Sequence, residues 1–218
     1  MRIGGLVKQS LLDYPNHIAA VVFTTGCNFR CGYCHNPALV LPQLYSQSDT
    51  ISAQEVLSFL SSRVGWLDAV VITGGEPTLH PHLPEFIASV KALGFRVKLD
   101  TNGTNPMMLQ HLVDLGLIDF IAMDIKHELT AEQYSRVIGL TVERTSAMLE
   151  SITASIDIIR SSGLPHEFRT VILPNVHTPR DKALMALQLN GTSAYRVTSF
   201  REGETVGDYM LEESTLYA

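Results

Sequence analysis

The sequence predicts an α/β domain whose sheet contains six parallel strands. Short runs rich in β-branched residues alternate along the chain with longer amphipathic stretches, which is the pattern of repeated strand–helix units. Helices of this length connect parallel strands through right-handed crossovers, in a sheet that is either doubly wound or curled toward a barrel. The length of 218 residues suits one such domain.

The strands are expected where apolar runs end in turn-forming or polar residues. The first run leads directly into the cysteines of the chain, and the second ends in a pair of glycines. The third and fourth runs carry acidic residues near their ends, and the fifth is closed by Pro174 and Asn175. The expected strands cover residues 18–25, 69–73, 96–101, 120–126, 167–173 and 194–200.

The helices are expected where apolar residues recur with a helical period and the ends carry capping signals. Ser52 stands three positions before Glu55, which is the spacing of a capping box. Gly94 and Gly116 follow the second and third helices, where a glycine typically ends a helix. The expected helices cover residues 52–64, 84–93, 106–115, 131–138, 144–162 and 180–189.

Composition and charge narrow the class of protein. An apolar share of 45% with 17% charged residues is typical of a folded globular chain. The formal net charge of −6 disfavours nucleic-acid binding and favours a protein or small-molecule substrate. The longest apolar run, residues 18–23, is far shorter than a membrane span, and no secretory signal is evident, so we expect a cytoplasmic protein without a membrane segment.

The cysteines are the most informative feature of the sequence. The chain contains only Cys27, Cys31 and Cys34, within a loop that follows the first expected strand. Three thiolates on one tight loop can hold three irons of a four-iron cluster and leave the fourth iron open to another ligand. The alternatives are buried structural thiols, a zinc site completed by His35 or another histidine, and an electron-transfer cluster, which usually has a protein ligand on all four irons.

Glycines and an acidic residue end the second expected strand, where α/β folds build their binding sites. This segment reads Gly74, Gly75, Glu76 and Pro77. The glycines allow the backbone to approach a ligand closely, and Glu76 can accept hydrogen bonds from an ammonium group. The alternative is a plain turn between a strand and a helix.

Charged residues end the next strands as well. Asp100 and Thr101 end the third expected strand, and Asp124 and Lys126 end the fourth, where both side chains point to the same face of the sheet. Arg169 lies in the fifth strand, and its guanidinium suits the recognition of a carboxylate. The alternatives are an internal Asp–Lys ion pair and a structural salt bridge of the arginine.

The cysteine spacing, with Tyr33 directly before the third cysteine, resembles that of the radical S-adenosylmethionine (SAM) superfamily. Residues 33–36, Tyr-Cys-His-Asn, are similar to the form found in activating enzymes of glycyl-radical enzymes. The opening of the chain, residues 3–6, 13–15 and 19–23, resembles the activating proteins of anaerobic ribonucleoside-triphosphate reductases. The resemblance implies a partial (β/α)6 barrel over residues 1–201. Residues 202–218 contain five acidic residues and no basic one, so we expect an acidic tail or cap there.

The resemblance also implies cofactors and roles for the residues named above. The three cysteines would bind a [4Fe–4S] cluster, residues 74–77 the methionine amino group of SAM, and Lys126 its carboxylate. Asp100, Thr101 and Asp124 resemble the ligands of a monovalent cation in pyruvate formate-lyase activators. Arg169 and Tyr33 are further candidates for contact with SAM.

The reaction implied by the resemblance is reductive cleavage of SAM followed by removal of a Cα hydrogen from a glycine of an anaerobic ribonucleotide reductase. The electron would come from an external flavodoxin or ferredoxin, because the chain has no second group of cysteines. Another glycyl-radical enzyme similar to pyruvate formate-lyase, or a small molecule, is an alternative substrate, and an iron–sulfur electron carrier is the non-enzymatic alternative. Arg201 stands where the pyruvate formate-lyase activators have a histidine, which weakens assignment to that subgroup.

Overall fold

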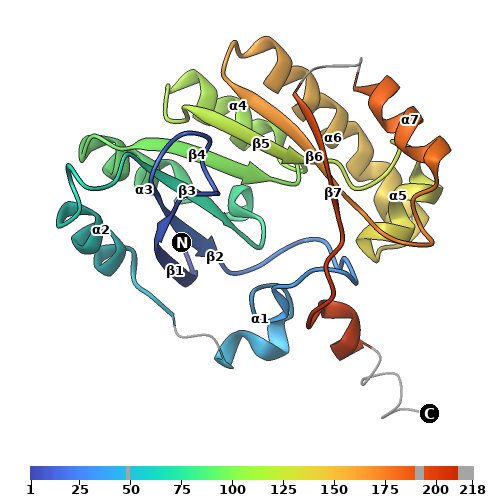
Figure 1. Ribbon diagram of the computed structural model, residues 1–218, viewed down its shortest axis with the longest axis horizontal. Coiled ribbons are helices and arrows are strands. Elements are labelled where there is room, and N and C mark those ends of the chain that lie inside the picture. The colour runs from blue at the N-terminus through green and yellow to red at the C-terminus, as the bar shows by residue number, and fades with distance from the viewer. Residues whose placement is uncertain (48–49, 190–193, 211–218) are drawn as a thin grey trace.

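Six parallel strands form a curved, open sheet in chain order (Figure 1). The structure is a computed structural model that describes residues 1–47, 50–189 and 194–210. The strands are β2 (Ala19–Thr24), β3 (Ala69–Gly74), β4 (Arg96–Thr101), β5 (Phe120–Asp124), β6 (His166–Ile172) and β7 (Tyr195–Ser199). The partial (β/α)6 barrel is therefore confirmed, and β4 has the bounds that the sequence predicts.

A further strand, β1 (Ile3–Ser10), was not predicted. It pairs with β2 in the antiparallel direction, with Gly5 opposite Phe23. Its sequence, IGGLVKQS, contains two glycines and three polar residues, so it lacks the β-branched run that marks the other strands. Because pairing with β2 rather than local propensity makes this segment a strand, the sheet has seven strands.

The helices between the strands lie around the outside of the curved sheet (Figure 1). Their packing against the sheet forms the main hydrophobic core. The predicted capping box is present, since the amide of Glu55 donates to Ser52 Oγ at 3.1 Å. None of the described helices has the length and apolar character needed to cross a bilayer. The helices are α2 (Ala53–Ser61), α3 (Leu83–Ala92), α4 (Pro106–Asp114), α5 (Ala131–Ile138), α6 (Val142–Ser161) and α7 (Pro179–Gln188).

The inner face of the sheet is filled at the amino ends of the strands. Tyr14, from the β1–β2 connection, is 3% exposed and packs with Ala19, Val21 and other small apolar residues. Its ring lies 5.7 Å from that of Phe120, centroid to centroid. The space left inside the partial barrel therefore lies toward the carboxyl ends of the strands.

The end of the described chain packs beside the loop that carries the cysteines. Figure 1 shows the last described helical turn next to α1 (Pro37–Val40), and Val206 is buried against Val40, Leu41 and Leu44. The expected acidic tail or cap at 202–218 lies in part outside the described residues, which end at 210. The described part contacts the cysteine loop directly, because the amide of Val206 donates to the carbonyl of Cys34.

Candidate active site

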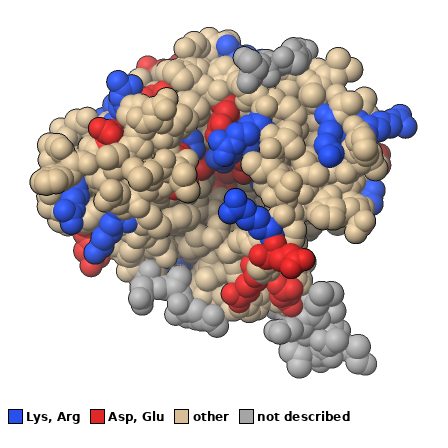
Figure 2. Space-filling view, viewed as in Figure 1, with Lys and Arg blue, Asp and Glu red and all other residues tan. Residues whose placement is uncertain are grey.

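A cavity of about 440 Å³ lies at the carboxyl ends of the strands. Figure 2 shows the hollow, with acidic and basic side chains gathered in it. Except for Pro77 and Arg169, all the site residues that the sequence predicts line its wall. They are Cys27, Cys31, Tyr33, Cys34, Gly74, Gly75, Glu76, Asp100, Thr101, Asp124 and Lys126.

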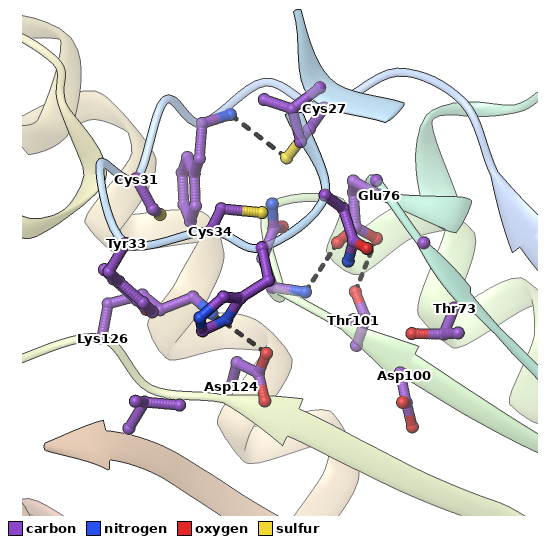
Figure 3. Close-up of a pocket in the computed structure, with 18 of the residues that line it drawn as sticks. Cys27, Cys31, Tyr33, Cys34, Thr73, Glu76, Asp100, Thr101, Asp124 and Lys126 are labelled. Atoms are coloured by element: carbon purple, nitrogen blue, oxygen red, sulfur yellow. Dashed lines mark hydrogen bonds and ion pairs between the residues drawn. The ribbon is translucent and has the colours of Figure 1, made fainter. Parts of the chain in front are cut away.

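The cysteine loop follows β2 and brings all three thiols to the cavity (Figure 3). Burial raises the pKa of Cys27 to about 12 and that of Cys31 to about 11, and it also raises the pKa of Cys34. The thiols therefore keep their protons at neutral pH until a metal replaces them. Together they offer a compact, buried set of sulfur ligands.

Backbone contacts hold the cysteine loop in place. The Arg30 guanidinium donates to the carbonyl oxygens of Cys27 and Phe29, each at 2.7 Å. The Arg30 amide donates to the carbonyl of Ile138 at 2.8 Å, which ties the loop to the end of α5. From the other side, the amide of Val206 donates to the carbonyl of Cys34 at 2.8 Å. The loop is therefore fixed by segments that are distant in sequence.

The donor set fits a cluster better than a single metal ion. Among the described residues, no three His, Cys, Asp or Glu side chains converge on one metal position. His35, the candidate fourth zinc ligand, has its Nε2 2.9 Å from the carbonyl oxygen of Arg201, and its ring stacks on Phe200. A four-iron cluster needs only one thiolate on each of three irons, which this loop can supply.

The turn at residues 74–76 connects the end of β3 to the start of the cysteine loop through backbone hydrogen bonds. The amide of Gly75 donates to the carbonyl of Thr24 at 2.8 Å, and that of Glu76 donates to the carbonyl of Gly26 at 2.7 Å. A Cβ on Gly75 would lie 2.0 Å from the Gly26 oxygen, and Gly74 has a φ of +112°. Glycine is therefore required at both positions, and the turn does more than connect a strand to a helix.

Glu76 is buried and accepts hydrogen bonds from three neighbouring residues. Its Oε1 accepts from the amide and hydroxyl of Thr78 and from the Thr101 hydroxyl, at 3.1, 2.5 and 2.8 Å. Its Oε2 accepts from the Asn102 amide at 2.6 Å. Burial raises its pKa, while these donors act in the opposite direction. Because Oε2 has one donor, it retains capacity for another, such as an ammonium group in the cavity.

We expect Glu76→Gln to lower the free energy of unfolding by about 2–3 kcal/mol, because the amide NH2 would face a hydrogen-bond donor in a buried site. Chemical denaturation of the apoprotein measures this change. Glu85→Gln, at an exposed position on α3, is the matched control and should change the free energy by less than about 0.5 kcal/mol. Equal effects of the two variants would contradict the prediction.

Charged side chains of β4, β5 and β6, together with Lys126 just after β5, form a chain of ion pairs that continues through Glu167 to Arg196 of β7. Lys126 Nζ lies 3.0 Å from Asp124 Oδ2, and Arg169 Nε lies 2.9 Å from Asp124 Oδ1. Arg169 also reaches Asp100 at 3.4 Å, and Lys98 lies 2.7 Å from the other oxygen of Asp100. Burial would raise the pKa of Asp124, but Arg169 and Lys126 hold it well below its usual range.

The sequence left open that Lys126 forms an internal ion pair with an aspartate and that Arg169 forms a structural salt bridge. Both ion pairs are present in this network. Lys126 lines the cavity as well, and its Nζ lies 5.8 Å from the centre of the Tyr33 ring. Arg169 does not line the cavity and orients Asp124 instead. Pro77 is buried and opens the short 3-10 helix η2 (Pro77–Leu79), directly after Glu76 of the cavity wall.

Sequence reasoning missed two parts of the site. Lys98 is 2% exposed and pairs with Asp100, two positions further along β4; the signal was a lysine on the same strand face as an acid. The Asn102 side chain donates to Asn28 at 2.9 Å, and Asn28 donates to Thr104 at 2.8 Å. These amides tie the cysteine loop to the end of β4, and no local pattern in the sequence marks them.

The comparison with known families agrees with this geometry. The sequence profile of the radical SAM superfamily matches residues 21–185, which is most of the chain and includes the three cysteines. This chain belongs to the radical SAM superfamily. The family implies an iron–sulfur cluster and SAM as cofactors, and the chain is therefore an enzyme of this superfamily.

Relatives of this radical SAM protein differ in the reactions that their names state. A protein of Methanocaldococcus jannaschii, provisionally named a glycyl-radical enzyme activating enzyme, is 31% identical over 199 residues, which are 91% of this chain and 79% of the relative. A protein of Saccharolobus solfataricus, provisionally named a GTP 3′,8-cyclase, is 29% identical over 140 residues, 63% of this chain and 43% of the relative.

A solved structure shows the same fold. The crystal structure of SuiB from Streptococcus suis superposes with a TM-score of 0.61 and 13% sequence identity. The superposition covers 90% of this chain but 46% of SuiB, so this chain spans about half the length of that protein. At this level of identity the likeness supports the partial barrel alone.

Proposed function

We propose that this radical SAM protein activates a glycyl-radical enzyme, specifically an anaerobic ribonucleotide reductase. The observation that carries the proposal is that three thiols, the Gly74–Glu76 turn and Lys126 line one cavity, with no fourth cysteine in the chain. Such a site can hold a cluster by three irons and leave the fourth iron for the amino and carboxylate groups of SAM. The relative named as an activating enzyme, which aligns over 91% of this chain, supports the same reaction.

Each part of the cavity wall has a role in this proposal. When bound, the cluster would supply the one electron that breaks the S–C5′ bond of SAM, giving methionine and a 5′-deoxyadenosyl radical that would take the glycine Cα hydrogen, form 5′-deoxyadenosine and leave the radical on the glycine. Lys126 supplies a positive charge for the SAM carboxylate, while Glu76 Oε2 accepts from its ammonium group. Tyr33 and the cysteine loop restrict the access of water to the cavity.

The number of cysteines and the net charge of the chain indicate which partners the proposed reaction involves. Its three cysteines suffice for one cluster, so an external flavodoxin or ferredoxin supplies the electron. The net charge of −6 disfavours nucleic acid as a substrate, and we place the reaction in the cytoplasm. A monovalent cation at Asp100, Thr101 and Asp124 stays a prediction; in this structure Lys98, Lys126 and Arg169 provide positive charge to the two carboxylates.

The test uses protein reconstituted with iron and sulfide without air. Mixed with dithionite, SAM and an anaerobic ribonucleotide reductase, it should produce 5′-deoxyadenosine, methionine and a glycyl-radical signal in electron paramagnetic resonance. Cleavage of SAM with a radical only on a pyruvate formate-lyase-like enzyme would move the assignment to that partner. A reducible cluster that cleaves no SAM would overturn the proposal in favour of an electron carrier.

A further inference from the structure

Strand β7 forms an edge of the sheet beside the cavity, and no other strand among the described residues pairs with its outer side. It is the last strand in the order, and Figure 1 shows it running down the front of the molecule toward the region of α1. Thr198 and Ser199 of β7 line the cavity together with Cys34 and His35 of the cysteine loop. The edge therefore borders the space in which the reaction is proposed to occur.

The register of β7 determines which of its backbone groups are free. The amide of Phe168 donates to the carbonyl of Ala194, and the amide of Phe200 donates to the carbonyl of Ile172. In a parallel ladder, every second residue of a strand bonds to the same neighbour. Arg196 and Thr198, which lie between Ala194 and Phe200, therefore also face β6, and their neighbours Val197 and Ser199 direct their N–H and C=O groups outward.

These outward groups are available to another chain. Within the described residues, no protein group hydrogen-bonds to the backbone of Val197 or Ser199 on the free side, and Val197 is 45% exposed. Unpaired N–H and C=O groups along a strand edge are a template for an added strand. A small molecule such as SAM has no main-chain repeat to match them, whereas an extended peptide does.

Arginine side chains near this edge favour a segment that carries a negative charge. Arg196 is 61% exposed in its side chain, and Arg201, just beyond β7, is exposed and lines the cavity. Arg196 Nη1 lies 3.8 Å from Glu167 Oε2, so of these two arginines Arg201 is the one without an ion pair among the described residues. An extended segment with a carboxylate near its glycine would therefore complement Arg201.

We propose that the partner enzyme presents its glycine as an extended segment that adds to the free edge of β7, with hydrogen bonds to the backbone of Val197 and Ser199. The inference rests on the proposed function and specifies how its protein substrate docks. Main-chain pairing places the segment along β7, and its glycine enters the cavity at the end of the strand, near Ser199. A glycine suits this position because its lack of a side chain allows the closest approach to the cavity.

The test removes one outward N–H without disturbing the β6–β7 ladder. Val197→Pro deletes a donor that does not face β6, a position where an edge strand tolerates proline. Val197→Ala is the matched control, because it shortens the same side chain and keeps the N–H. Binding of each apoprotein to an anaerobic ribonucleotide reductase is measured by calorimetry, and we expect Val197→Pro to weaken it about fivefold to tenfold, and Val197→Ala less than about twofold.

A second readout uses the unmodified chain and needs no variant to fold. Hydrogen–deuterium exchange at residues 195–199 should slow when the reductase is added, because the free amides become bonded. Ser199→Pro should weaken binding in the same way as Val197→Pro. Equal binding by both proline variants and the wild type, or unchanged exchange on addition of a reductase that does bind, would overturn the edge proposal.

Measurement of SAM cleavage separates this inference from the proposed function. Reconstituted Val197→Pro should cleave SAM in the absence of the reductase at the wild-type rate, while its yield of glycyl radical at limiting reductase falls about fivefold, in step with binding. Wild-type protein that cleaves no SAM refutes the proposed function. If the wild type forms the glycyl radical and Val197→Pro forms it in equal yield, only the docking on β7 is refuted.

Discussion

Replacing Cys31 by alanine is expected to lower the rate of SAM cleavage by at least about 1000-fold, because the cluster would lose one of its three protein ligands. The chain has no spare cysteine to replace it. Cys31 is 7% exposed and packs as a small apolar residue, so alanine should leave the apoprotein folded. Formation of 5′-deoxyadenosine by anaerobically reconstituted protein, together with its iron content, measures the effect.

Gly32→Ala provides the matched control in the same loop. A Cβ at Gly32 would meet its nearest neighbour, the Cα of Gly207, at 3.9 Å, which is ordinary contact. All three thiols remain in this variant, so cluster content and SAM cleavage should stay within about twofold of wild type. Undiminished cleavage by Cys31→Ala would show that the cysteine loop does not hold the catalytic cluster.

The second large effect is expected from Gly75→Ala. The new Cβ would lie 2.0 Å from the Gly26 carbonyl oxygen, so the turn and the cysteine loop would have to separate. Overpacking against backbone costs about 3 kcal/mol, which we expect as a loss in the free energy of unfolding. Because Cys27 directly follows Gly26, SAM cleavage should fall about 100-fold through displacement of the cluster. Denaturant titration and the cleavage assay measure the two effects.

Gly5→Ala separates the close approach at Gly75 from the general effect of replacing a glycine. Gly5 lies in β1, and a Cβ there would contact Phe23 at 3.6 Å, an ordinary distance. This control should keep the stability of the wild type within about 1 kcal/mol and the full rate of cleavage. A Gly75→Ala protein as stable and active as Gly5→Ala would contradict the tight contact with Gly26.

The alternation of apolar runs and helical stretches was sufficient to predict the six parallel strands. The buried run at β3, AVVITG, and the capping box at Ser52 are signals that local sequence carries by itself. Strand β1 lacked such a signal, because its glycines and polar residues have low strand propensity and only pairing with β2 orders it. Elements that are stabilised by their own residues could be predicted, whereas a strand that is stabilised by pairing with another segment could not.

The candidate site likewise contains groups that the sequence predicts and groups that only the structure reveals. The cysteine spacing and the Gly74–Glu76 turn are short-range patterns, because one loop or one turn supplies all their groups. The pair of Asn28 with Asn102 joins the cysteine loop to the end of β4, so its role emerged only from the structure, whereas Lys98 pairs with Asp100 on its own strand. The contact of Val206 with the carbonyl of Cys34 joins positions even further apart in the chain.

The sequence by itself determined the strand–helix order and the set of three thiols, because neighbouring residues encode both. The tertiary structure decided that Arg169 pairs with both Asp100 and Asp124, that Thr101 and Asn102 donate to Glu76, and that the edge of β7 is free of a further strand among the described residues. These features depend on the distance between segments that are far apart in sequence. Such distances are set by the packing and curvature of the whole sheet, which no local pattern specifies.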